Sequence, residues 1–132
     1  MRVSLDTNVL VSAFTTRGIC ADILAVVLAE HQLVLGEKVL GELGRVLREK
    51  MKMPEDSVAE ADAFLRQEAA VISKGDQLDV PIRDPDDAEV LAQAVEGLAD
   101  VLVTGDRDLL DVVDKLPVEV LSPRGFWEKL HG

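Results

Sequence analysis

Five acidic residues of this 132-residue sequence stand where a folded chain could gather them around divalent cations. They are Asp6, Glu42, Asp87, Asp106 and Asp108. Carboxylates in one cleft repel each other, so such a cluster is typical of a site for hard cations such as Mg²⁺ or Mn²⁺. Two such ions about 3.5 to 4 Å apart can activate a water and stabilise the oxygen that leaves a phosphate. The acids therefore indicate metal-assisted phosphoryl chemistry.

The elements that must position these acids alternate between short apolar strands and helices. We expect strands at 3–5, 32–35, 71–72, 99–104 and 118–121, and helices at 19–30, 37–50, 55–70, 84–97, around 109–110 and at 122–130, with a loop up to residue 83. Strands separated by helices pair in parallel through right-handed crossovers. We therefore predict an α/β fold, a three-layer α/β/α sandwich around a central, mainly parallel sheet, with residues 1–132 forming a single domain.

The predicted fold would bring the five acids together, because ligands in open α/β sheets bind at the carboxyl ends of the strands. Asp6 ends the first predicted strand, and Asp106 and Asp108 follow a later one. Asp87 and Glu42 lie on helices that can face the same crevice. All five are therefore candidate catalytic residues and metal ligands.

Each acid also has a plainer explanation. Asp87 could stabilise a helix dipole, Glu42 could pair with Arg45 on the helix surface, and Asp108 could cap the short helix after it. Asp6 could also be a capping residue, although a buried carboxylate without compensation would cost several kcal/mol. The sequence leaves these alternatives open.

The net charge of −11, from 14 basic and 25 acidic residues, excludes a broad basic face for nucleic acids. A basic partner protein or a cation-holding acid cluster remains compatible with that charge. The longest apolar run, 23–29, is far shorter than the roughly 20 residues of a membrane span, so we expect no membrane association. The beginning of the sequence has no signal segment, and the lone Cys20 fits a reducing compartment, so we expect a cytoplasmic protein.

Four short motifs together resemble the PIN-domain ribonucleases, especially the toxin components of bacterial and archaeal toxin–antitoxin pairs. The motifs are residues 5–13, Glu42, residues 83–94 and residues 103–110. The resemblance covers nearly the whole chain. It implies a PIN-like fold in which Asp6, Glu42, Asp87 and Asp106 bind metal and Asp108 is a fifth carboxylate. In the Asp84-Pro85-Asp86-Asp87 stretch, Asp84 or Asp86 could substitute for Asp87, which we prefer.

For this family the expected reaction is hydrolysis of RNA phosphodiesters by a metal-activated water, through a two-metal mechanism with Mg²⁺ or Mn²⁺. Asn8 and Thr104 would orient ligands or water, unless they are plain turn residues. Arg107 would contact RNA phosphates, as could Arg17, Arg45 and Arg48. The resemblance also implies a homodimer and a small antitoxin partner, and we expect the free chain to expose an apolar patch along 19–27 or to bury it in the dimer.

Two other functions remain possible. A Mg²⁺-dependent phosphotransfer or phosphatase-type α/β domain also places an Asp after its first strand. However, Asn8 stands where an aspartyl-nucleophile phosphatase would have a second Asp. A non-catalytic acidic module that binds a basic partner is compatible with the net charge. Trapping of covalent phosphate on Asp6 would identify a phosphotransfer or phosphatase-type domain. RNA cleavage with Mn²⁺ would exclude a non-catalytic module.

Overall fold

A parallel five-stranded sheet forms the centre of the molecule, in a computed structural model that describes residues 1–74, 82–111 and 117–132. The strands are β1 (Arg2–Leu5), β2 (Gln32–Gly36), β3 (Ala70–Ile72), β4 (Val101–Val103) and β5 (Glu119–Leu121). Their order is β3-β2-β1-β4-β5, and Val3 of β1 is paired with Leu33 on one side and Val101 on the other. The chain moves outward from β1 in one direction and then from β4 in the other. The junction between β1 and β4 is therefore the switch point at which such sheets bind ligands.

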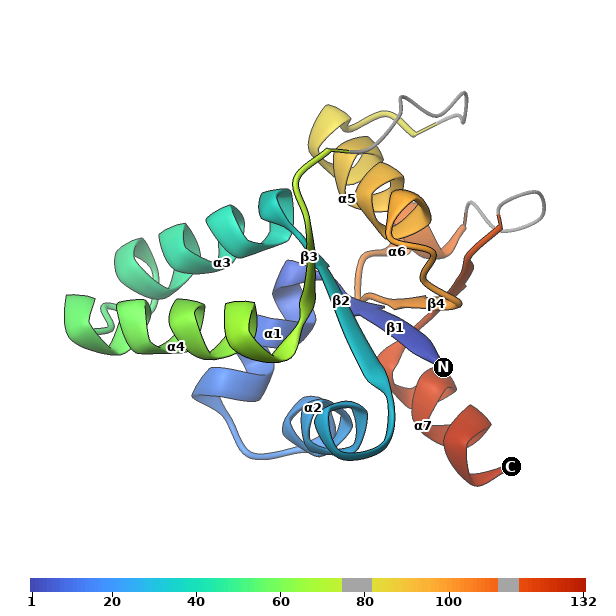
Figure 1. Ribbon diagram of the computed structural model, residues 1–132, viewed down its shortest axis with the longest axis horizontal. Helices are drawn as coiled ribbons and strands as arrows, with labels where there is room; N and C mark the ends of the chain where they lie inside the picture. The colour runs from blue at the N-terminus through green and yellow to red at the C-terminus, as the bar shows by residue number, and fades with distance from the viewer. Residues whose placement is uncertain (75–81, 112–116) are drawn as a thin grey trace.

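Helices cover both faces of the sheet. They are α1 (Thr7–Thr15), α2 (Ile19–Glu30), α3 (Glu37–Glu49), α4 (Glu55–Glu68), α5 (Pro85–Glu96), α6 (Arg107–Leu110) and α7 (Pro123–His131). Figure 1 shows α5 and α6 on one side of the sheet and α1, α2 and α7 on the other, while α3 and α4 lie side by side and extend away from it. The predicted three-layer α/β/α sandwich is confirmed.

The largest difference from the expected elements is α1, which the sequence analysis did not predict. Asp6 begins this helix, because its side chain accepts a hydrogen bond from the backbone N–H of Thr7 at 2.8 Å. Val9 and Leu10 of this helix are buried in the core. The other expected elements are present with small shifts at their ends, and the expected loop before residue 83 lies mostly outside the described residues, at 75–81.

The apolar residues of α2 contribute to the core of the chain itself. Ile23 and Val27 are fully buried and Leu24 is 8% exposed, whereas Ile19 at the beginning of the helix is 38% exposed. The expectation that the free chain exposes an apolar patch along 19–27 is therefore wrong: α2 packs against α1, α7 and β2. Within the described parts of the chain, no single helix is long and apolar enough to cross a bilayer, and α1 with α2 passes that test only as a pair bent by 102°.

The contact between α3 and α5 depends on a glycine. Gly36 precedes α3, and a Cβ atom added there would lie 2.7 Å from Cβ of the buried Gln93 and closer still to its amide. The same amide oxygen accepts a hydrogen bond from the backbone N–H of Lys38 at 3.0 Å. This close approach holds together the two helices that carry Glu42 and Asp87.

We expect Gly36→Ala to destabilise the protein by about 1 to 3 kcal/mol, because Gln93 would have to leave its position. Gly41→Ala on the same helix is the matched control, since a Cβ atom there meets open space. It should stabilise the protein by about 0.5 to 1 kcal/mol. Urea unfolding of both variants measures the two effects. Equal free energies of unfolding for the two variants would contradict a role for Gly36 in this contact.

Candidate metal centre

Asp6 lies at the switch point, with its carboxylate almost fully buried at 5% residue exposure. One oxygen accepts the Thr7 N–H, and the other accepts the hydroxyl of Thr104 at 2.7 Å and the side-chain amide of Asn8 at 3.4 Å. Burial raises the pKa of Asp6 above its ordinary value, and the charge of Asp106 adds to this, although the three hydrogen bonds oppose it. Asp6 is therefore both a helix cap and a carboxylate facing other acids.

Thr104 and Asn8 fasten the loop after β4 to Asp6. The fully buried Thr104 hydroxyl donates to Asp6 and accepts the backbone N–H of Asp106 at 3.0 Å. The side-chain oxygen of Asn8 accepts the backbone N–H of Gly105 at 3.0 Å. These bonds fix the ends of β1 and β4 relative to each other, so both side chains position the acids that follow the two strands.

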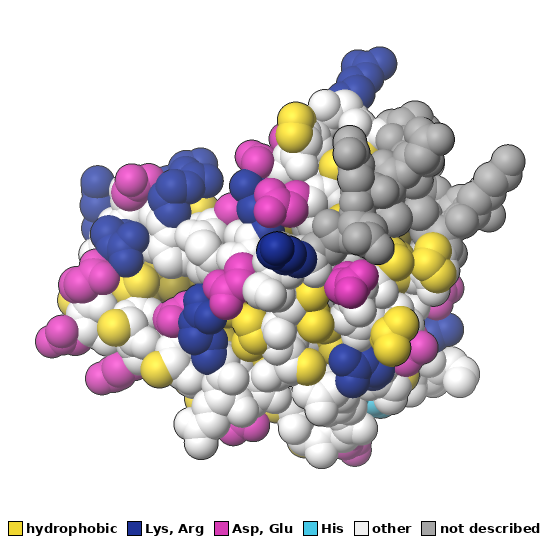
Figure 2. Space-filling view, turned by 45° about the horizontal axis from the view of Figure 1, so that its top comes forward, with side chains coloured by type: hydrophobic (Ala, Val, Ile, Leu, Met, Phe, Trp, Pro, Cys, Tyr) yellow, Lys and Arg dark blue, Asp and Glu magenta, His cyan; other side chains and the backbone are white. Residues whose placement is uncertain are grey.

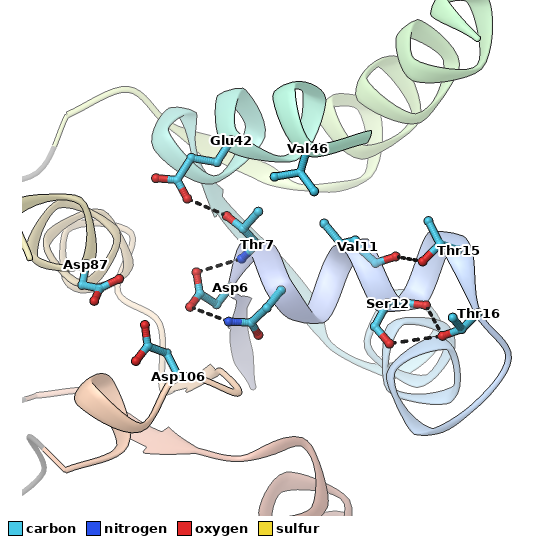
Figure 3. Close-up of a pocket in the computed structure, with 11 residues that line it drawn as sticks. Asp6, Thr7, Val11, Ser12, Thr15, Thr16, Glu42, Val46, Asp87 and Asp106 are labelled. Atoms are coloured by element: carbon cyan, nitrogen blue, oxygen red, sulfur yellow. Dashed lines mark hydrogen bonds between the residues drawn. The ribbon is translucent and has the colours of Figure 1, made fainter. Parts of the chain in front are cut away.

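Four of the five candidate acids line one cavity of about 500 Å³ at this end of the sheet. They are Asp6, Glu42, Asp87 and Asp106. In Figure 3 the carboxylates of Asp6, Asp87 and Asp106 point toward one another from the end of β1, from α5 and from the loop after β4, and Glu42 approaches from α3. The structure thus gathers acids that are up to 100 residues apart in the sequence.

The fifth candidate, Asp108, lies at the edge of this group. One carboxylate oxygen from each of Asp87, Asp106 and Asp108 lies within 4.8 Å of the other two, although Asp108 itself is exposed. The plainer explanation, in which Asp108 caps the following helix, is wrong. Asp106 caps α6 instead, because its side chain accepts the backbone N–H of Asp108 at 2.9 Å.

Asp87 shows most clearly that negative charge is concentrated here. Burial, followed by the charges of Asp106, Asp84 and Asp6, raises the pKa of Asp87 to about 7. Asp84 accepts the backbone N–H of Asp86 at 2.8 Å and so begins α5, and Asp86 pairs with Lys38 at 2.7 Å. Of these three neighbouring acids, only Asp87 faces the cavity.

Lys38 is a residue of this site that the sequence analysis missed. Its ammonium group lies 2.7 Å from Asp86, 3.5 Å from Glu42 and 3.7 Å from Glu89, so it bridges α3 and α5 at the edge of the cavity. Glu42 also accepts the hydroxyl of Thr7 at 3.0 Å. The position of Lys38 one helical turn before Glu42 was the sequence signal that could have identified it.

Two of the four suggested arginines, Arg45 and Arg48, form surface ion pairs. Arg45 pairs with Glu49 at 3.8 Å, not with Glu42, and Arg48 pairs with Glu55 at 2.6 Å. Arg107 and Arg17 are exposed. Figure 2 shows Lys and Arg side chains interspersed with Asp and Glu side chains over the face of the molecule that it draws. An RNA contact by any of these four arginines stays a prediction.

The donor set fits a hard divalent cation. The converging ligand atoms are carboxylate oxygens, the type that Mg²⁺ and Mn²⁺ prefer. Burial and the charge of Asp106 raise the pKa values of Asp6 and Asp87, and a nearby positive charge would lower them. A cation bound among Asp6, Asp87 and Asp106 would supply that charge.

A comparison with models of protein families identifies the family of this chain. A model of the PIN domain matches residues 2–108, which include all five acids. The chain belongs to the PIN domain family. No curated protein matches the sequence at a significant level.

Solved structures show the same fold as this PIN domain. VapBC2 from Rickettsia felis, bound to a DNA fragment from its promoter, has a TM-score of 0.67 at 17% sequence identity and covers 92% of this chain and 98% of that one. VapBC-1 from nontypeable Haemophilus influenzae has a TM-score of 0.64 at 18% identity, and the match covers 94% of this chain and 99% of that one. At this identity the likeness concerns the fold.

The raised pKa of Asp87 predicts how the stability of the metal-free protein depends on pH. In the unfolded chain this carboxyl has its ordinary pKa of 3.8, whereas in the folded chain the pKa is about 7. Its contribution to stability is therefore complete below pH 4 and is lost as the pH rises through 7. In EDTA the melting temperature should fall between pH 5 and 8, and Asp87→Asn should flatten that fall. A melting temperature that rises over this range in the wild type would contradict the prediction.

Proposed function

We propose that this PIN domain is a Mg²⁺- or Mn²⁺-dependent ribonuclease and the toxin of a toxin–antitoxin pair. The observation that supports it best is the convergence of Asp6, Glu42, Asp87 and Asp106 on one cavity at the switch point of the sheet. The family supports a nuclease, and the sequence resemblance supports RNA as its substrate.

In this proposal Asp6, Asp87 and Asp106 are the central metal ligands, with Glu42 and Asp108 on either side. These residues would hold divalent ions, which would supply positive charge to lower the pKa of water and to stabilise the leaving oxygen of the phosphodiester. Asn8 and Thr104 hold the carboxylate of Asp6 in one orientation. Glu42 is fixed by Thr7 on one side and Lys38 on the other. The protein thus contributes a rigid frame of ligands and no covalent intermediate.

The surroundings of Asp6 disfavour the phosphatase-type alternative. An aspartyl-nucleophile phosphatase would have a second Asp two residues after its nucleophile, where this chain has Asn8. Asn8 binds the Gly105 backbone and Asp6, so it supports the frame and donates no proton from a carboxyl group. This residue therefore favours hydrolysis by water.

The proposed partner is a small antitoxin. Both structural neighbours are VapBC antitoxin–toxin assemblies, and the described acids form a site that a basic group of a partner would complement. We also propose a homodimer, on the basis of the sequence resemblance. Size-exclusion chromatography with light scattering, with and without the product of a co-transcribed neighbouring gene, tests both assemblies.

The direct test of the function is incubation of defined RNAs with the purified protein in Mn²⁺, in Mg²⁺ and in EDTA. We expect cleavage with either metal and none in EDTA. Undiminished cleavage in EDTA would exclude a metal-dependent mechanism. Labelling of Asp6 by a phosphate donor would favour the phosphotransfer alternative instead.

A further inference from the structure

The cavity that holds the acids continues along α1, away from the candidate metal ligands. Its further part is lined by Val11, Ser12, Thr15 and Thr16 of α1 and its end, and by Val46 of α3. Figure 3 shows these side chains beyond Asp6 and Glu42. The lining residues there are uncharged, in contrast to the acidic part around Asp6.

Two of the three hydroxyl groups in this part of the cavity donate to backbone oxygens. Thr15 donates to the backbone oxygen of Val11 at 2.6 Å, and Thr16 donates to the backbone oxygen of Ser12 at 2.8 Å. The Ser12 and Thr16 hydroxyls lie 3.2 Å apart. Either hydroxyl can be the donor in that pair. The Thr15 and Thr16 hydroxyls, whose protons go to backbone oxygens, therefore offer lone pairs to a ligand.

An uncharged surface whose threonine hydroxyls present lone pairs offers little to phosphate groups, whose outer oxygens are acceptors too. It favours a group that carries O–H or N–H donors. Val11 and Val46 add apolar surface beside these acceptors, which suits the flat face of a base or the carbon side of a sugar. The neighbouring acidic part of the cavity is where the phosphate would lie in the proposed reaction.

We propose that this part of the cavity, the α1 subsite, binds a nucleoside next to the scissile phosphate by accepting hydrogen bonds from its donor groups at Ser12 and Thr16. The inference rests on the proposed ribonuclease function and adds a specificity-determining contact to it. The donor is either the ribose 2′-hydroxyl or an exocyclic amino group of the base. A 2′-hydroxyl contact would let the site distinguish RNA from DNA.

The test compares one cleavable RNA with two sets of analogues, in Mn²⁺. In the first set a single nucleotide beside the cleavage point lacks its 2′-hydroxyl, and in the second a single base lacks its amino group. We expect the wild type to cleave an analogue from one of the sets about three- to tenfold more slowly in kcat/KM, the effect of one hydrogen bond. The set that contains that analogue identifies the donor.

The variant Ser12→Ala/Thr16→Val decides whether the discrimination comes from the α1 subsite. It should cleave the parent RNA and the analogue at equal rates. Ser57→Ala, an exposed hydroxyl of α4, is the matched control and should discriminate as the wild type does. Unchanged discrimination in the double variant, or none in the wild type, would overturn the subsite while RNA cleavage itself persists. Failure of the wild type to cleave any RNA would overturn the ribonuclease function and the subsite with it.

Discussion

Asp6→Asn and Asp106→Asn are each expected to reduce metal-dependent RNA cleavage at least about a hundredfold. Residues that only support a metal ligand already cost about 10- to 100-fold when substituted, so a ligand should cost no less. Because ligands of one metal centre act as a unit, the double variant should be little worse than either single one. Initial rates with saturating Mn²⁺ measure all three.

Glu60→Gln is the control for loss of a negative charge. Glu60 is exposed on α4 and does not line the cavity, so this variant should cleave RNA as the wild type does. Circular dichroism must show that each Asn variant remains folded. Modest losses in the two single variants that multiply in the double variant would place Asp6 and Asp106 outside the metal centre.

The fold could be predicted because the buried strands leave an unambiguous pattern. The three residues of β4, Val101–Val103, and residues 33–35 of β2 are all buried and apolar, so these strands are apolar on both faces, as expected for strands covered by helices on both sides. The helix α1 was harder to recognise. Its apolar run at 9–11 includes two β-branched valines, and its start signal, Asp6, was interpreted as a site residue. In the structure Asp6 caps α1 and also lines the cavity with the other acids.

The candidate site could be predicted to the extent that strand ends determine it. The positions of Asp6 and Asp106 follow from the topology, because β1 and β4 are neighbours. The pairing of Lys38 with Glu42 follows from their spacing on one helix, but its pairing with Asp86 depends on how α3 and α5 pack, which periodicity does not reveal. In the same way, the capping role moved from Asp108 to Asp106, since only the backbone path after β4 determines which carboxylate meets an N–H.

A metal ligand and a structural acid affect the stability of the protein in opposite ways. Asp87 has no capping role among the described contacts, and burial together with the charges of three acids raises its pKa, so its charge is unfavourable in the metal-free fold. In EDTA at pH 8, Asp87→Asn should therefore melt at or above the wild type. Mn²⁺ that binds only the native state should stabilise the wild type by about 2.7 kcal/mol at a hundredfold excess over the dissociation constant of one site. Asp87→Asn should lose most of this gain.

Asp84→Ala on the same helix provides the opposite case. Asp84 caps α5, so its loss should cost about 0.5 to 2 kcal/mol both in EDTA and in Mn²⁺. Asp6→Asn combines the two effects, because relief of repulsion is offset by weaker bonds to Thr104 and Thr7. Melting curves of the three variants in both buffers therefore separate metal binding from capping. If Asp87→Asn is destabilised in EDTA and keeps the full Mn²⁺ shift, Asp87 supports the fold and does not bind the metal.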